Sequence, residues 1–228
     1  MHTDICYTQS GDIMKTCYIV AAGDANDIYI EKEENDIIIA CDAGLEHCRN
    51  NGINPDYVIG DFDSLGFIPQ NNNVIILPVE KDDTDTSYAV KYAMKNGFTR
   101  FVIFCGTGGK RPEHTYANIA LLGFISKNCG EGFLVDKSCV ITAITDSVIH
   151  FDENMSGDIS VFSFDTRSCG ITEKGLKYSL DNVTLNNTDI VGVSNSFIGM
   201  KSSVSVEKGT LIIYFSGKIS DITIDKLN

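Results

Sequence analysis

The sequence predicts an α/β fold followed by an all-β region, with a mostly parallel α/β/α domain first and a C-terminal β-sandwich second. Two observations favour the first part: short apolar runs alternate with helical patterns, and polar loops follow the runs. A third favours the second part: after about residue 130, helical periodicity stops and short strand-like runs take over. We place the two domains at residues 14–132 and 137–228, so that the first begins at Met14.

The strands of the first domain are predicted from runs that are apolar along their length, as in strands covered on both faces. These runs are Cys17–Ala22, Ile37–Cys41, Tyr57–Ile59, Val74–Leu77 and Phe101–Cys105. Two helices are also predicted. One is capped by Thr84 and ended by Gly97, and the other covers about residues 113–128.

The strands of the second domain are predicted from shorter runs separated by turn residues. These runs are Val140–Thr145, Val148–Phe151, Ile159–Phe164, Val183–Leu185, Val204–Val206 and Leu211–Phe215. The segment Glu207–Thr210 is predicted as a hairpin turn between the last two runs. Other turns are expected at Asn154–Gly157, Ser168–Gly170 and Asp181–Asn182.

Composition excludes several classes of protein. A net charge of −13 argues against a broad nucleic-acid-binding surface. No run of about 18 apolar residues indicates a membrane span, and no signal peptide pattern is present. The eight cysteines include no Cys-x-x-Cys pair, and the apolar runs around Cys41 and Cys105 predict buried free thiols. We therefore expect a cytoplasmic protein.

Two carboxylates, Asp61 and Asp63, follow the third predicted strand. In an extended segment they would point the same way, and they would repel each other unless a cation or a shared proton relieved them. Mg²⁺ commonly takes one or two carboxylates together with substrate phosphates. The segment therefore indicates either a Mg²⁺–nucleotide site or a solvated acidic turn.

The ends of the other predicted strands favour the metal–nucleotide interpretation. Asp42 follows the second strand, Asp82 and Asp85 follow the fourth, and a glycine-rich segment follows the fifth. Open α/β sheets bind ligands at the carboxyl ends of their strands, so these loops are expected to converge on one crevice.

The glycine-rich segment runs from Gly106 to His114 and is predicted to bind phosphate. Glycines let the backbone approach an anion, the following helix start adds partial positive charge, and Lys110 and Arg111 add full charges. The spacing is not that of a Walker A loop, and an ordinary strand-to-helix turn is the alternative. Lys81 either reaches a phosphate or offsets the charge of Asp82 and Asp83, and His114 either contacts the ligand or caps the helix.

Taken in order, these segments resemble the bacterial thiamine pyrophosphokinase family. The resemblance extends from about Thr16 to Phe215. It is carried by Asp42-Ala43-Gly44, Pro55-Asp56, Gly60-Asp61-Phe62-Asp63-Ser64, Lys81-Asp82-Asp83-Thr84-Asp85, Gly108-Gly109-Lys110-Arg111-Pro112-Glu113-His114-Thr115 with Ala117-Asn118-Ile119, Gly175-Leu176-Lys177-Tyr178 and Ser194-Asn195-Ser196-Phe197-Ile198-Gly199.

The resemblance implies a function and a set of roles. It implies an ATP-binding α/β domain, a thiamine-binding sandwich, and a homodimer whose subunits share active sites. The reaction would transfer the β,γ-diphosphate of ATP to the thiamine hydroxyl, giving thiamine diphosphate and AMP. Residues implied to be catalytic are Asp61, Asp63, Asp85 and Arg111, of which the three aspartates would hold Mg²⁺. Residues implied to bind ATP are Asp42, Lys81, Asp82, Thr107, Gly108, Gly109, Lys110, Glu113 and His114. Residues implied to contact thiamine are Tyr178, Ser194 and Asn195.

The chain departs from the family at two of these positions. Glu113 stands where the family usually has Asp, and Tyr178 stands where Trp is frequent. From residue types alone, Tyr178 also suits sandwich packing, and Ser194 with Asn195 also suits a turn. Two other functions stay open: a related diphosphokinase acting on another hydroxymethyl heterocycle such as a pterin, and a nucleotide-binding sensor without catalysis.

Overall fold

A computed structural model describes residues 14–63, 66–70 and 73–227, so the residues before Met14 lie outside the described part. The fold is dominated by β-sheet, with few helices. Contacts divide the chain into two compact units. One takes in the described residues up to Leu121 together with Leu134–Lys137, and the other takes in Leu122–Phe133 and the residues from Ser138 onward. Among the described residues, no helix is long and apolar enough to cross a membrane.

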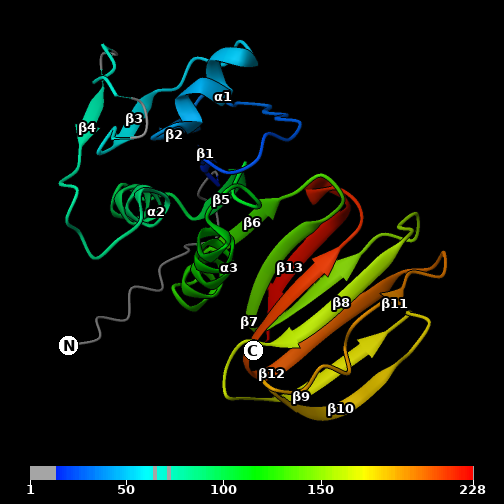
Figure 1. The fold of residues 1–228 in the computed structure, drawn as a ribbon. Coiled ribbons are helices and arrows are strands. Elements are labelled where there is room, and N and C mark those ends of the chain that lie inside the picture. The colour runs from blue at the N-terminus through cyan, green and yellow to red at the C-terminus, as the bar shows by residue number, and fades with distance from the viewer. Residues whose placement is uncertain (1–13, 64–65, 71–72, 228) are drawn as a thin grey trace. The chain divides into compact units, whose positions relative to one another are not determined.

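The first unit contains five parallel strands in the order β5-β1-β2-β3-β4 (Figure 1). They are β1 (Thr16–Val20), β2 (Ile37–Cys41), β3 (Tyr57–Gly60), β4 (Val74–Ile76) and β5 (Arg100–Phe104). The helices are α1 (Gly44–Asn50), α2 (Asp85–Lys95) and α3 (Pro112–Lys127), and the division between the units runs through α3. All five predicted strands are confirmed, as are both predicted helices.

The helix α2 begins as its sequence predicts. Thr84 is its N-cap, and the Thr84 side chain accepts a hydrogen bond from the Ser87 backbone N–H. This cap fixes the first turn of α2, which carries Asp85. Asp85 thereby lies at the carboxyl ends of the parallel strands, together with the other polar loops.

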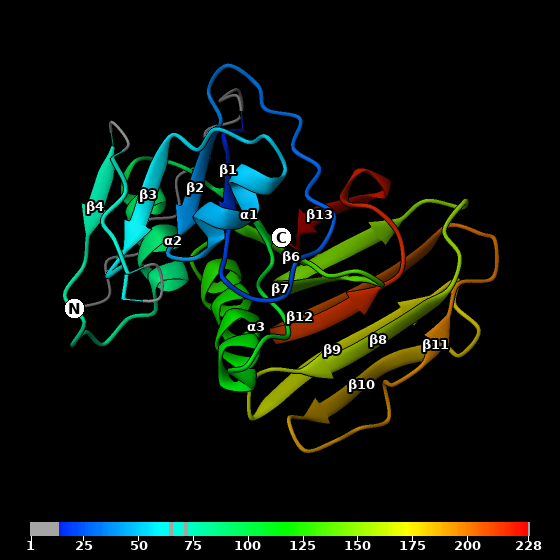
Figure 2. The ribbon, with the colours of Figure 1, turned by 45° about the horizontal axis from the view of Figure 1, so that its top comes forward.

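The second unit is built mainly from antiparallel strands (Figure 2). They are β7 (Val140–Phe151), β8 (Asp158–Ser163), β9 (Arg167–Lys174), β10 (Leu180–Asn186), β11 (Asn195–Ser196), β12 (Ser202–Phe215) and β13 (Ile222–Lys226). A 3₁₀ helix, η1, covers Ile219–Asp221, and the division between the units runs through β6 (Glu131–Val135). The long β12 pairs with β7, β8 and β9. The sequence did not indicate β6, β9, β11 or β13.

The hairpin turn predicted at Glu207–Thr210 is wrong. β12 passes through this segment and pairs with β7 on both sides, with a register shift between Val206 and Thr210. Gly209 has a φ of 114°, and its N–H donates to Asp146 Oδ1 at 2.8 Å. The glycine therefore serves a β-bulge within a continuous strand, because a bulge needs the same backbone freedom as a turn.

The turns predicted at Ser168–Gly170 and Asp181–Asn182 are wrong for the same reason. Both segments lie inside strands, β9 and β10, with Gly170 at a φ of 68° and Asn182 at a φ of 49°. The β9–β10 pairing shifts register on both sides of Val183. Residues that tolerate positive φ mark irregular strands here, not strand ends.

Gly44 determines how closely α1 approaches the sheet. It is the first residue of α1 and is buried. A Cβ at this position would lie 2.1 Å from the Val20 carbonyl oxygen at the end of β1. Because the Val20 carbonyl belongs to the backbone, neither β1 nor α1 can move away without a loss of stability.

We expect Gly44→Ala to lower the free energy of unfolding by about 1–3 kcal/mol, since the added methyl group must displace backbone. The matched control is Gly97→Ala, which has a φ of 82° and open space around its Cβ position. That change should cost only about 1 kcal/mol of backbone strain. Urea denaturation compares the two variants, and a Gly44→Ala protein at least as stable as Gly97→Ala would contradict the packing argument.

Candidate active site

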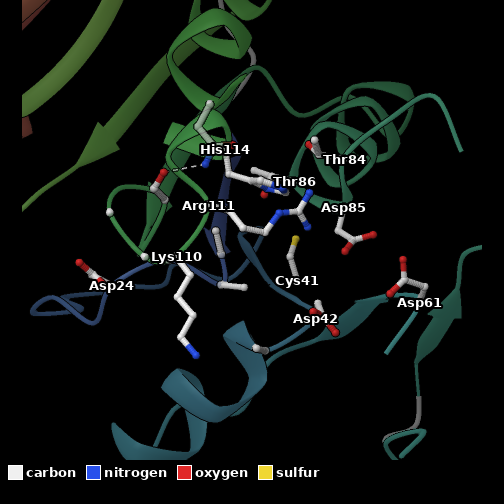
Figure 3. A pocket seen from close by; sticks show the side chains of 18 of the residues that line it. Asp24, Cys41, Asp42, Asp61, Thr84, Asp85, Thr86, Lys110, Arg111 and His114 are labelled. Carbon is white, nitrogen blue, oxygen red and sulfur yellow. Dashed lines mark hydrogen bonds between the residues drawn. The ribbon is translucent and has the colours of Figure 1, made fainter. Parts of the chain in front are cut away.

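A cavity of about 560 Å³ lies in the first unit, where β1, β2 and β3 end and where α2 and α3 begin (Figure 3). The predicted residues that line it are Asp42, Asp61, Asp63, Asp85, Gly108, Gly109, Lys110, Arg111 and His114. The structure thus brings the acidic loops and the glycine-rich loop to one cavity, as the strand-end argument predicted.

Three carboxylates form the acidic side of the cavity. One ligand oxygen from each of Asp42, Asp61 and Asp63 lies within 4.8 Å of the others, a spacing that suits a shared cation. Asp42 is 7% exposed, and its Oδ1 has no hydrogen-bond partner among the described residues. A buried carboxylate oxygen without a partner is costly, which favours a ligand at this position.

The geometry that joins Asp61 and Asp63 differs from the extended segment that the sequence argument assumed. β3 ends at Gly60, and the intervening Phe62 is buried with a φ of 60°. The chain turns here, and the Asp63 N–H donates to Asp61 Oδ1 at 3.3 Å. The two carboxylates lie close together because of this turn and not because of strand alternation.

Lys81 connects the acidic side to α2. Its Nζ lies 2.7 Å from Asp61 Oδ2 and 2.8 Å from Asp85 Oδ1, with 15% of its side chain exposed. The hydrogen bond from Lys81 is the main cause that lowers the pKa of Asp61. Burial raises the pKa of Asp85 despite the opposing effect of Lys81. Lys81 therefore offsets Asp61 and Asp85, whereas the sequence had suggested Asp82 and Asp83 as its partners.

The opposite side of the cavity carries the glycine-rich loop. Gly108 and Gly109 have φ values of 68° and 78°, and the Gly108 N–H donates to Thr115 Oγ1 at 3.0 Å. Figure 3 shows the Arg111 guanidinium extending toward the side where Asp42 and Asp85 lie. Positive charge and exposed backbone thus face the carboxylates across one space.

Four residues predicted to bind ATP do not line the cavity: Lys81, Asp82, Thr107 and Glu113. Thr107 Oγ1 donates to Asp136 Oδ1 at 2.9 Å. Thr107 therefore holds the glycine-rich loop through a contact outside the cavity lining. Glu113 accepts from Arg111 Nε at 3.0 Å and is exposed. Asp82 is exposed.

Several lining residues lie outside the predicted site: Ala21–Asp24, Cys41, Ala43, Thr84, Thr86 and Asn118. Gly106 also lines the cavity and belongs to the predicted glycine-rich segment. Gly23 and Asp24 follow the first strand, so the tendency of ligands to bind at the carboxyl ends of parallel strands also points to these two residues. A Cβ on Gly108 would lie 2.2 Å from Asp24 Oδ2, so only glycine allows this approach. Asn118 Nδ2 donates to the Gly106 carbonyl at 2.7 Å and is buried. Burial raises the pKa of the Cys41 thiol, which keeps it protonated.

The predicted thiamine-contacting residues all lie in the second unit, and they differ in exposure. Tyr178 is 61% exposed, with Lys177 Nζ 5.4 Å from its ring centroid. Ser194 is exposed, has a φ of 60°, and its N–H donates to Ser160 Oγ. Asn195 is buried, and its side chain bonds to the Tyr178 backbone.

Two family models match the chain. One describes the catalytic domain of thiamin pyrophosphokinase and matches residues 29–130, and the other describes its vitamin B1 binding domain and matches residues 146–211. A thiamine pyrophosphokinase from Bacillus subtilis is 32% identical over 213 residues, covering 88% of this chain and 98% of that protein.

Solved structures agree with these matches. The crystal structure of thiamine pyrophosphokinase from Bacillus subtilis superposes with a TM-score of 0.77 at 28% identity, covering 90% of this chain and 100% of the other. A thiamin pyrophosphokinase from Geobacillus thermodenitrificans gives a TM-score of 0.74 at 23% identity, with 90% and 99% covered, which supports the fold. The coverage and identity of these relatives show that the chain belongs to the thiamine pyrophosphokinase family.

Proposed function

We propose that the chain, by family a thiamine diphosphokinase, transfers the β,γ-diphosphate of ATP to the thiamine hydroxyl with the help of Mg²⁺, releasing AMP. The observation that carries this proposal is the cavity in which clustered carboxylates face a glycine-rich loop with Lys110 and Arg111. In this proposal residues 14–132 form an ATP-binding α/β/α domain, and residues 137–228 form a thiamine-binding β-sandwich.

The residues at the acidic side fit a magnesium ion. Mg²⁺ prefers oxygen ligands, and Asp42, Asp61 and Asp63 offer carboxylate oxygens within 4.8 Å of one another. The unpartnered Oδ1 of buried Asp42 is satisfied if it faces a cation. The resemblance implied Asp85 as the third metal ligand in place of Asp42; in this proposal Asp85, which is paired with Lys81, would support the set through Lys81. When bound, the ion would neutralise the negative charge of the triphosphate.

The chain's own residues would do the remaining work by positioning and charge stabilisation. The start of α3 and the backbone N–H groups of the glycine-rich loop other than that of Gly108, which donates to Thr115, would orient the phosphates. Arg111 would stabilise the charge that develops as the alcohol attacks the β-phosphorus and AMP leaves. His114 lines the same cavity and would contact the nucleotide.

The second unit would supply the thiamine contacts. Tyr178 presents an exposed ring suited to stacking on a cationic heterocycle. Ser194 is also exposed and directly precedes Asn195, whose side chain bonds to the Tyr178 backbone. We further propose a cytoplasmic homodimer with shared active sites. Exposed apolar side chains at Ile190, Val191 and Ile198 suit such an interface.

The first test is AMP release from ATP in the presence of Mg²⁺ and thiamine. Asp61→Asn and Asp63→Asn should each lower turnover by at least about 100-fold while circular dichroism stays unchanged, because a metal ligand is lost and the fold is not. The matched control is Asp225→Asn, an exposed aspartate on β13 in the second unit, which should retain activity.

The outcomes of this assay separate the competing functions. Near-normal AMP release by either active-site variant would reject the metal site. AMP release with a hydroxymethyl pterin but not with thiamine would move the assignment to a related diphosphokinase. ATP binding without AMP release from any alcohol would favour a sensor.

A second test uses Lys81 and stability instead of activity. Lys81→Met should lower the free energy of unfolding by about 1–3 kcal/mol at neutral pH, since it leaves Asp61 and Asp85 without their cation. Millimolar Mg²⁺ should then raise the melting temperature of this variant more than that of the unmodified chain, because a bound ion replaces the lost charge.

The control for this test is Lys32→Met. Lys32 Nζ binds both oxygens of Asp56 at 2.7 Å, and neither residue lines the cavity. Millimolar Mg²⁺ should raise the melting temperature of the Lys32→Met variant no more than that of the unmodified chain. Equal shifts in the two variants would mean that Mg²⁺ acts on general surface charge and not on the cluster.

A further inference from the structure

The side chain of Asn195 uses all of its hydrogen-bonding capacity inside the protein. Its Nδ2 donates to Glu173 Oε2 at 2.8 Å and to the Tyr178 carbonyl at 2.7 Å. Its Oδ1 accepts from the backbone N–H groups of Tyr178 and Ser196, each at 2.9 Å. An amide has two donor hydrogens and two acceptor lone pairs, so nothing remains for a ligand. Asn195 is also only 6% exposed.

Glu173 holds the Asn195 amide in this orientation. It lies on β9, is 2% exposed, and contributes a carboxylate oxygen that accepts from Nδ2. A flipped amide would place Oδ1 against the carboxylate and Nδ2 against two backbone N–H groups, losing four hydrogen bonds. The other carboxylate oxygen of Glu173, Oε1, is buried without a hydrogen-bond partner among the described residues, and burial raises the pKa of Glu173. A carboxyl group kept there needs a role that offsets its burial.

The backbone is anchored at Tyr178 itself and over the three residues that precede it. Gly175 has a φ of 69°, and a Cβ there would lie 2.3 Å from the Lys201 carbonyl oxygen. Leu176 forms a β-bridge with Phe197, and the Lys177 N–H donates to the Ser196 carbonyl at 3.0 Å. Asn195 then holds both the N–H and the carbonyl of Tyr178 itself. An exposed ring is thus carried on a backbone with little freedom.

We propose that Glu173 is a positioning residue that acts through Asn195 to hold the Tyr178 backbone, so that the Tyr178 ring is presented as a stacking surface for an aromatic, cationic heterocycle. The inference rests on the proposed function, because it takes thiamine as that heterocycle. In this proposal Asn195 does not contact the substrate. It holds the backbone of Tyr178, which makes the contact. Glu173 itself touches neither substrate nor nucleotide in this account.

Steady-state kinetics test the proposal. Glu173→Leu, which removes the acceptor at similar volume, should raise the thiamine KM by roughly 10-fold or more, with kcat and the ATP KM changed by less than about 2-fold. Glu173→Gln can still accept from Asn195 and should restore most of the affinity. The matched control is Thr142→Val, which removes another buried hydrogen bond of the same unit, from Thr142 Oγ1 to the Gly132 carbonyl. It should lower stability but leave the thiamine KM unchanged.

A spectroscopic readout separates failure of this inference from failure of the proposed function. The chain has no Trp, so Tyr178→Trp introduces a single tryptophan, which can be excited selectively over the remaining tyrosines, at the position in question. Its anisotropy should decay faster when Glu173→Leu is added, whether or not thiamine is turned over. If Glu173→Leu fails to fold, Asn195→Ala, which leaves Glu173 in place, should give the same pattern. An unchanged thiamine KM together with unchanged anisotropy in the folded variant would overturn the positioning role, and inactivity of the unmodified chain toward thiamine would instead reject the proposed function.

Discussion

The first unit depends on the neutralisation of carboxylates that its sheet brings together. Parallel strands end at one edge, so Asp42, Asp61, Asp63 and Asp85 arrive at one cavity. Lys81 binds two of them, Asp61 and Asp85. The buried Oδ1 of Asp42 still has no partner among the described residues. Like charges in partial burial are tolerable only with cations nearby, so this arrangement favours a bound cation beside the carboxylates.

The backbone at this edge carries strain of its own. After β2, β3 and β5 the chain turns through Asp42, Phe62 and Cys105, which have φ values of 46°, 60° and 52°. None of these is glycine, and each costs about 1 kcal/mol or more in the left-handed region. Phe62 and Cys105 are buried at 3% and 0% exposure, so packing holds them there. A positive φ at a strand end changes the direction of the chain that follows. In this protein the residues that follow include Asp63 and the glycine-rich loop.

Much of the architecture is predictable from the sequence, because apolar runs report burial directly. The five parallel strands and the capped start of α2 follow from periodicity and from Thr84 alone. Sequence reasoning fails where one residue type serves two backbone purposes. Gly209, Gly170 and Asn182 have the chemistry of turns, yet all three lie within strands. Only strand pairing distinguishes a bulge from a turn, and pairing is a property of distant residues.

The site shows the same limit at the level of side chains. Strand ends identify which loops meet, so the acidic residues and Arg111 were found, but residue type does not reveal whether a polar group is already satisfied. Asn195 has the chemistry of a ligand contact, yet its four hydrogen bonds are all internal. Its partner Glu173 lies on a strand that the sequence did not indicate.

In the proposed arrangement the exposed Tyr178 contacts the heterocycle, and the buried Glu173 acts through Asn195 to hold Tyr178 in place. An aromatic ring binds a heterocycle best when its orientation is already set, since ordering it on binding costs conformational entropy. Buried hydrogen bonds to the Tyr178 backbone remove part of that cost, because water cannot compete for them. A tyrosine in place of a larger ring makes this constraint more important, since less stacking area is available to offset the ordering of a mobile side chain.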